Sequence, residues 1–307
     1  SDVYKRQIKN NTSIAMPTIG FGTYLISDED APKTINSAIK IGYRHIDTAE
    51  VYRNEVGIGL GLKESFTQFS VKRDDIFITS KVFPGNPSWG REVKNYKMCI
   101  EACDNSLERL NLDYLDCYLI HAPFCKDHRL EQWKALCDLK KEGKTRTIGV
   151  SNYSQLHIQE IINEGLEVPE YNQIELHPWC QKEELVSFLK EKNIKVVAYS
   201  SLVPLEGWRA KPNQDSAKSQ SMKEDGADNS SPFKRMSKKY GVSEAQILLK
   251  WGLQMGFVIL PKSSDENRIR ENFDLSFQID DSDMKEISTM DKGDGIAWPN
   301  GDPCNSE

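Results

Sequence analysis

Apolar positions follow two alternating patterns along this chain, short β-rich runs and longer stretches with helical spacing. Residues 31–41, for example, place Ile35, Ala38 and Ile39 on one stripe, as an amphipathic helix does. The predicted strands cover 19–23, 44–47, 76–81, 115–121, 147–150, 171–175, 195–199 and 258–260. The predicted helices cover 31–41, 54–66, 91–110, 130–142, 155–162, 182–192 and 243–255, and a last helix begins near Asp265.

This alternation predicts eight strand–helix units on one chain. Strands that alternate with helices form a parallel sheet. Eight units, rather than five or six, favour closure into a barrel over an open sheet. We therefore expect an α/β fold, a single (β/α)8 TIM barrel over residues 8–307, with an N-terminal hairpin at 8–17 and substrate loops at the C-terminal mouth.

Two segments do not follow this alternation of strands and helices. Residues 206–231 are rich in polar residues and Gly, and a connection this long is usually a functional lid or a flexible insertion. The composition favours disorder for 215–231 and a lid for 203–209. The first seven residues, SDVYKRQ, resemble the in-frame translation of a sequencing-library adapter, so we treat residues 1–7 as non-native and exclude them from the fold.

The charge balance and the cysteines limit the classes of partner and the cellular compartment that we expect. The chain has 40 basic and 46 acidic residues in a mixed pattern, which argues against a partner that is a nucleic acid or a membrane surface. No apolar run approaches the ~20 residues needed to span a bilayer. The seven cysteines are scattered without CxxC or zinc-finger spacing, which indicates buried free thiols and a reducing compartment. We expect a cytoplasmic monomer whose partner is a small molecule.

Polar side chains fall at nearly every predicted strand end, where the working residues of a barrel lie. Polar groups that converge on one rim are informative, because burying them without partners costs a few kcal/mol each. In chain order these positions are Asp47, Lys81, His121, Ser151–Asn152, Gln173, Tyr199 and Lys262–Ser263.

Four side chains near these ends suit a reaction centre. A free tyrosine has a pKa of ~10 and is a poor acid at neutral pH, but a neighbouring ammonium lowers that pKa. Lys81 can supply the charge next to Tyr52, and Asp47 can hold Lys81 as an ion pair. His121 can donate a hydrogen bond to a carbonyl oxygen and orient it.

Each of these residues also has a structural interpretation when it is taken alone. Asp47 and Lys81 could form only a structural ion pair, and Tyr52 could be a half-buried structural tyrosine. His121 alone would be a satisfied core histidine. The order in which the motifs occur decides between the two interpretations.

Several stretches resemble the aldo-keto reductase family, in family order from about residue 16 to residue 275. The segment GYRHIDTAEVYRNE at 42–55 resembles the family signature, and ITSK at 78–81 its lysine strand. The histidine strand is LDCYLIH at 115–121. Later landmarks are GVSNY at 149–153, QIELHP at 173–178 and LPKS at 260–263.

The resemblance implies a catalytic tetrad of Asp47, Tyr52, Lys81 and His121. It implies an NADPH-dependent carbonyl reductase that transfers a hydride from nicotinamide to an aldehyde, with ketones left open. Tyr52 is implied as the proton donor, and the product is an alcohol. The competing class is a barrel that binds NADPH without catalysis, but a pure binder has no need of all four residues.

The resemblance also implies where NADPH or NADP+ binds. Ser151, Asn152 and Gln173 are implied to hold the nicotinamide carboxamide, and Tyr199 to stack under the ring. The remaining implied contacts are Thr23 and Asp47 on the nicotinamide side, Ser200 and Leu202 at the pyrophosphate, and Glu271 and Asn272 near the adenine.

A phosphate site is expected near the end of the chain, where two cations and two hydroxyls meet a helix N-terminus. These residues are Lys262, Ser263, Ser264 and Arg268. By resemblance this is the site of the adenosine 2′-phosphate. The chain has no GxGxxG motif, so a Rossmann site is not implied.

The substrate pocket is expected to consist of Tyr24, Tyr52, Phe83 and His121, with Trp89 as a further apolar candidate. Ala122 replaces an aromatic residue common in the family and should open the pocket on one side. A metal-dependent hydrolase would need clustered histidines and carboxylates at strand ends, and only His121 and Asp47 qualify, so we expect no metal. We interpret His177 as structural and His157 as a surface residue.

Overall fold

The computed structural model describes residues 15–205 and 231–307. The adapter-like residues 1–7, most of the predicted hairpin at 8–17 and nearly all of the segment 206–231 lie outside the described residues. The same holds for the predicted lid beyond residue 205.

Within these ranges, eight strands form one parallel sheet in sequence order, which confirms the predicted barrel. Ile19 forms a parallel bridge with Ile259, and this bridge joins the two edges of the sheet. The Gly20 amide donates to the Ile259 carbonyl over 2.8 Å at the same junction. The strands are β1 (Phe21–Gly22), β2 (His45–Asp47), β3 (Phe77–Val82), β4 (Leu115–Ile120), β5 (Thr145–Ser151), β6 (Tyr171–Glu175), β7 (Lys195–Tyr199) and β8 (Val258–Ile259).

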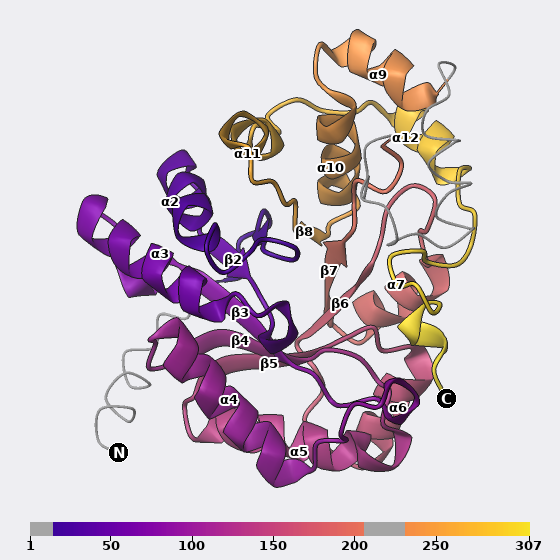
Figure 1. Cartoon of the computed structure of the whole chain (residues 1–307). Helices are drawn as coiled ribbons and strands as arrows, with labels where there is room; N and C mark the ends of the chain where they lie inside the picture. Colours follow the sequence, from indigo (N-terminus) through magenta and orange to yellow (C-terminus); the bar gives the residue numbers. More distant parts are fainter. Residues whose placement is uncertain (1–14, 206–230) are drawn as a thin grey trace.

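The helices surround the strands (Figure 1). Most lie where the apolar spacing predicts them. They are α2 (Ala31–Ile41), α3 (Glu55–Gln68), α4 (Tyr96–Leu110), α5 (Arg129–Lys141), α6 (Gln155–Asn163), α7 (Glu183–Glu191), α9 (Pro232–Tyr240), α10 (Glu244–Gln254), α11 (Glu266–Phe273) and α12 (Asp281–Ser288). Among the described residues, no helix has both the length and the apolar character needed to cross a membrane.

One predicted helix needs a corrected start, and two helices were missed. Helix α4 begins at Tyr96, not near residue 91, because the Asn95 side chain caps it by accepting from the Met98 amide. Helices α9 and α12 were not predicted. They have nine and eight residues, too few to establish a helical period from two or three apolar positions.

His157 is buried, not on the surface as predicted. Its Nδ1 accepts from the Ser154 amide over 3.0 Å, and its Nε2 lies 2.9 Å from the Ser306 carbonyl oxygen. The end of the chain therefore lies against α6 (Figure 1) and covers this histidine. The sequence near His157 could not predict this burial, because the contact is with Ser306, far along the chain.

Alternation along the strands decides which side chains enter the barrel. A compact cluster of buried apolar side chains includes Phe77, Leu119 and Tyr171 from three strands. Four residues beyond Phe77 on the same face comes Lys81, and two beyond Leu119 comes His121. The C-terminal end of the barrel is therefore lined by polar groups above an apolar floor.

His45, on the same inward face of β2, makes stability depend on pH. Burial lowers the pKa of His45 to about 4, although the neighbouring Asp47 carboxylate raises it. The unfolded chain binds a proton at an ordinary histidine pKa of ~6.5, whereas folded His45 does not bind one until about pH 4. The neutral form of His45 therefore does not reduce the stability of the fold above about pH 6.5, and stability is lost as the pH falls from about 6.5 to about 4.

We predict that acidification from pH 7 to pH 5 lowers the free energy of unfolding by about 2 kcal/mol through His45 alone. Urea unfolding at both pH values measures it. His45→Gln should remove this part of the pH dependence, because glutamine does not titrate. An identical pH dependence in the variant and the wild type would contradict the assignment.

Candidate active site

A buried ion pair lies at the centre of the barrel mouth. The Lys81 Nζ is 2.6 Å from the Asp47 Oδ1, and the two side chains are 0% and 4% exposed. The ammonium also donates to the Thr48 carbonyl over 2.8 Å. Burial lowers the pKa of Lys81, and the Asp47 carboxylate opposes that shift. The alternation of side chains along β2 and β3 therefore places the Lys81 ammonium inside the barrel mouth, where Asp47 holds it.

Tyr52 lies directly above this charge. It ends the short 3-10 turn Glu50–Tyr52 after β2 and is half-buried. The Lys81 Nζ is 5.1 Å from the centre of the Tyr52 ring. The rings of Tyr52 and His121 meet edge to face, with centroids 5.6 Å apart. The structure therefore brings all four predicted tetrad residues together.

His121 is a neutral imidazole in this site. Burial, together with the charge on Lys81, holds the pKa of His121 well below its ordinary value. Within the described part of the chain its Nδ1 has no hydrogen-bond partner. A neutral ring carries one N–H, so His121 can donate one hydrogen bond to an oxygen without protonating it.

Two residues that were not predicted as site residues, Glu50 and Lys94, hold the loop that carries Tyr52. The Glu50 Oε1 accepts from the Phe83 amide over 2.6 Å and from the Lys94 Nζ over 2.8 Å. Lys94 also donates to the Phe83 carbonyl. Glu50 lies inside the family-like signature, but Lys94 is more than forty residues away, and no sequence pattern links the two.

The residues predicted to hold the nicotinamide form one network beside the tetrad. The Gln173 Nε2 donates to the Asp47 Oδ2 over 2.8 Å. The Asn152 Nδ2 donates to the His121 carbonyl over 2.9 Å, and the Tyr199 hydroxyl donates to the Asn152 Oδ1 over 2.7 Å. Side-chain amides at this rim therefore lie next to the four predicted tetrad residues.

Ser151 and Thr23 complete this part of the rim. The Ser151 hydroxyl donates to the Gln173 carbonyl over 2.8 Å, and the Thr23 hydroxyl donates to the Asp47 carbonyl over 2.9 Å. Beyond β7, Ser200 adopts a left-handed backbone with φ +57°, and Leu202 is half-buried.

The predicted phosphate residues meet at the start of α11. The Asp265 side chain caps this helix by accepting from the Arg268 amide over 2.9 Å. The Ser263 hydroxyl accepts from the Asp265 amide over 3.1 Å and from the Arg268 Nε over 3.4 Å. Lys262, Ser264 and Arg268 are exposed, whereas Asn272 is buried and Glu271 is half-buried.

Aromatic side chains line the mouth around the tetrad. Phe83 stacks on Trp89 with a centroid distance of 6.4 Å, and Trp89 stacks on Trp298 with a distance of 6.0 Å. Phe124 packs edge-on against both tryptophans. Tyr24 is exposed, and its ring centre lies 5.1 Å from that of Tyr52.

The structure adds to the expected pocket. Ala122 is completely buried, and the expectation that it opens the pocket on one side stays a prediction. Phe124 and Trp298 were not predicted. A tryptophan beside Pro299 in an aperiodic tail was the available signal for Trp298, but its position over the mouth depends on contacts made far along the chain.

A family comparison agrees with this geometry. The model of the aldo/keto reductase family matches residues 18–292. The glyoxal reductase of Bacillus subtilis is 37% identical over 300 residues, which cover 97% of each chain. The methylglyoxal reductase of Escherichia coli is 36% identical over 288 residues, covering 93% of this chain and 94% of that relative.

Solved structures give the same result. An aldo-keto reductase from a deep-sea metagenome library superposes with a TM-score of 0.79 at 32% identity, covering 93% of this chain and 95% of that one. An aldo-keto reductase of Bombyx mori in complex with NADP superposes with a TM-score of 0.78 at 30% identity. That match covers 92% of this chain and 91% of that one.

We predict that Asp47→Asn lowers the free energy of unfolding by about 3–5 kcal/mol, because Lys81 is left buried without its charge partner. Urea denaturation at pH 7 measures the loss. The double variant Asp47→Asn/Lys81→Met, which removes both charges, should recover a large part of it. Equal losses in the single and double variants would show that the pair is not coupled.

Proposed function

This chain belongs to the aldo/keto reductase family, and we propose that it is an NADPH-dependent reductase of small aldehydes with Tyr52 as the proton donor. The chain is thus an oxidoreductase that reduces carbonyl groups. One observation carries the finer proposal. The buried Lys81–Asp47 pair lies beneath Tyr52, and a neutral His121 lies beside it.

The proposed reaction adds a hydride to the carbonyl carbon and a proton to the carbonyl oxygen. Bound NADPH supplies the hydride. The Tyr52 hydroxyl gives up its proton to the oxygen as the C=O double bond becomes a single bond, and an alcohol results. The Lys81 ammonium stabilises the phenolate that forms, because an adjacent positive charge favours the ionised phenol.

His121 orients the substrate in this scheme. A neutral imidazole donates one N–H to the carbonyl oxygen and cannot compete with Tyr52 as the acid at neutral pH. The two rings are in edge-to-face contact with their centres 5.6 Å apart, and in this scheme the phenol hydroxyl and the imidazole N–H share one carbonyl oxygen of the substrate. Asp47 acts by holding Lys81 in place.

The polar groups present fit NADPH at both of its ends. Ser151, Asn152 and Gln173 offer hydroxyl and amide groups that match the donors and acceptors of a carboxamide. The cations of Lys262 and Arg268, with the Ser263 hydroxyl at a helix start, suit a phosphate dianion. A cofactor bound at both groups would span the rim from β5 to α11.

We propose small aldehydes, including 2-oxoaldehydes, as the substrate class. The relatives named glyoxal reductase and methylglyoxal reductase support this class. The aromatic side chains around His121 suit an apolar substituent next to the carbonyl group.

We also propose that the protein is a monomer and that it is cytoplasmic, and the seven cysteines, all buried free thiols, support the reducing compartment.

Tyr52→Phe should lower the rate of aldehyde turnover by about 10²–10⁴-fold while NADPH still binds, because loss of a proton-transfer group typically has an effect of this size. The measurement is NADPH oxidation by absorbance with glyoxal, methylglyoxal and benzaldehyde, together with NADPH binding by fluorescence titration.

Tyr114→Phe is the matched control, because Tyr114 precedes β4 at the opposite end of the barrel and its hydroxyl bonds Asp74. It should keep wild-type turnover. Tight NADPH binding without turnover of any aldehyde, in wild type and variants alike, would mean that the barrel only binds the cofactor.

Arg268→Gln should weaken NADPH binding by about tenfold, equivalent to ~1.4 kcal/mol, and leave NADH binding nearly unchanged. The reason is that only NADPH carries the 2′-phosphate. Dissociation constants for both cofactors, measured at two salt concentrations, test it. An equal loss for NADH would place Arg268 elsewhere in the cofactor site.

A further inference from the structure

A buried carboxylate at the end of β6 has no role in the chemistry described so far. Glu175 is 1% exposed and follows Gln173 on the inward face of the strand. In the sheet register it lies opposite Tyr199. Glu175 Oε1 lies 2.9 Å from the His177 Nε2 and accepts from the Ile296 amide over 2.8 Å, and Oε2 accepts from the Ala297 amide over 2.9 Å.

This carboxylate is ionised. Burial alone would raise the pKa of Glu175, but hydrogen bonds from His177 and from the two amides outweigh burial and hold the pKa below its usual range. A buried negative charge of this kind must keep its donors, because losing them leaves it unsatisfied. The two amides belong to a segment more than one hundred residues away.

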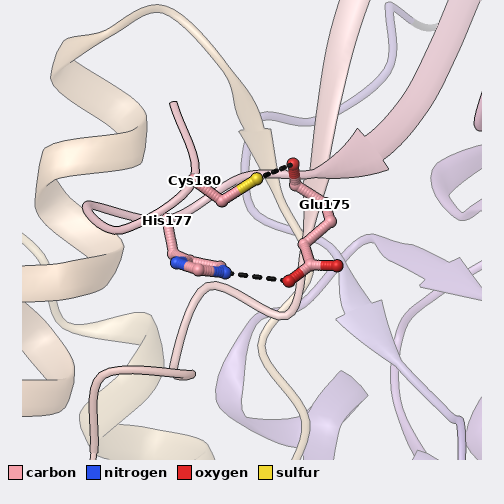
Figure 2. A group of neighbouring side chains, drawn as sticks. All are labelled: Glu175, His177 and Cys180. Carbon is pink, nitrogen blue, oxygen red and sulfur yellow. Dashed lines mark hydrogen bonds and ion pairs between the residues drawn. The ribbon is translucent and has the colours of Figure 1, made fainter. Parts of the chain in front are cut away.

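Glu175, His177 and Cys180 also have the residue types of a metal site, with one ligand atom from each within 4.8 Å of the others. Figure 2 shows the His177 ring directed at the Glu175 carboxylate, while the Cys180 sulfur points to the Glu175 carbonyl oxygen. Both carboxylate oxygens already accept N–H groups, and a metal would have to displace them. The group is therefore better suited to anchor the chain.

The loop after β6 holds the C-terminal segment (residues 291–304) at both of its ends as well. The Gln181 amide donates to the Asp291 Oδ1 over 3.1 Å. Lys182 forms an ion pair with the buried Asp302. Glu175 thus binds the middle of a segment whose two ends are fixed by neighbouring residues.

Trp298 follows directly after the two anchored amides. Its Nε1 donates to the Tyr199 hydroxyl over 2.8 Å, which in turn donates to Asn152. The indole ring lies 6.0 Å from the His121 ring and stacks on Trp89. The anchored segment therefore supplies one aromatic wall of the mouth and contacts the nicotinamide side of the rim.

We propose that Glu175 is a positioning residue that holds the C-terminal segment, so that Trp298 selects aldehydes with a bulky aromatic substituent. The selection of substrate rests on the proposed reductase function. The anchoring of the segment does not, and it is measured without turnover.

Hydrogen exchange tests the anchor. In Glu175→Gln the side chain has the same size, but its NH2 group faces an amide donor and only one oxygen remains as acceptor. Exchange of the peptide containing Ile296 and Ala297 should become about tenfold faster, as expected when one buried hydrogen bond is lost. Glu191→Gln, on the exposed face of α7, is the matched control and should leave this exchange unchanged.

Steady-state kinetics test the selection. For a bulky aromatic aldehyde, KM should rise about tenfold in Glu175→Gln, whereas kcat and KM for methylglyoxal should change by less than about threefold. Trp298→Ala should raise the KM for the aromatic aldehyde by at least as much. The double variant should be no worse than Trp298→Ala, because both changes remove one wall.

Gly295→Ala disturbs the anchor without changing the Glu175 residue itself. A Cβ at Gly295 would lie 2.4 Å from the Glu175 Oε2 and 3.1 Å from the Asp302 Oδ2, so the Glu175 carboxylate or the segment must shift and the hydrogen bonds between them are strained. This variant should reproduce both the faster exchange and the higher KM. It therefore tests the anchoring of the segment and the substrate selection if Glu175→Gln does not fold.

Unchanged exchange at 296–297 in Glu175→Gln and Gly295→Ala would overturn the anchor. Faster exchange with no change in KM for the aromatic aldehyde would overturn the selection by Trp298. If no aldehyde is turned over by the wild type, the proposed function fails, and the exchange result still decides the anchor.

Discussion

The charge of Lys81 inside the barrel is the constraint on which the rest of the site depends. A buried ammonium is costly unless it is paired and hydrogen-bonded, and here Asp47 and the Thr48 carbonyl do both. Asp47 can do so only because β2 and β3 are adjacent parallel strands that end at the same rim. Gln173 then satisfies the second carboxylate oxygen and ties β6 into the same network.

The same charge sets the protonation of its neighbours. Lys81 helps to keep His121 neutral, and a cation beneath a phenol favours its ionised form. The mouth therefore has a layer of charged and polar side chains and an aromatic wall. The polar layer comes from strand ends, whereas the wall comes from loops and from the C-terminal segment that Glu175 holds.

The sequence was sufficient for the parts of the molecule that follow local rules. Strand alternation and motif order predicted the barrel and brought Asp47, Lys81 and His121 to one rim. It was insufficient where distant segments meet. The burial of His157 under the chain end and the position of Trp298 both depend on long-range contacts without periodicity. The roles of the site residues stay predictions.

The pH dependence of kcat/KM for aldehyde reduction, compared between wild type and Lys81→Met, tests the central claim most directly. If the Lys81 charge sets the acidity of the proton donor, the fall in rate at alkaline pH should occur at lower pH in the wild type than in the variant. The same alkaline limb in both proteins, with NADPH binding intact, would contradict the account.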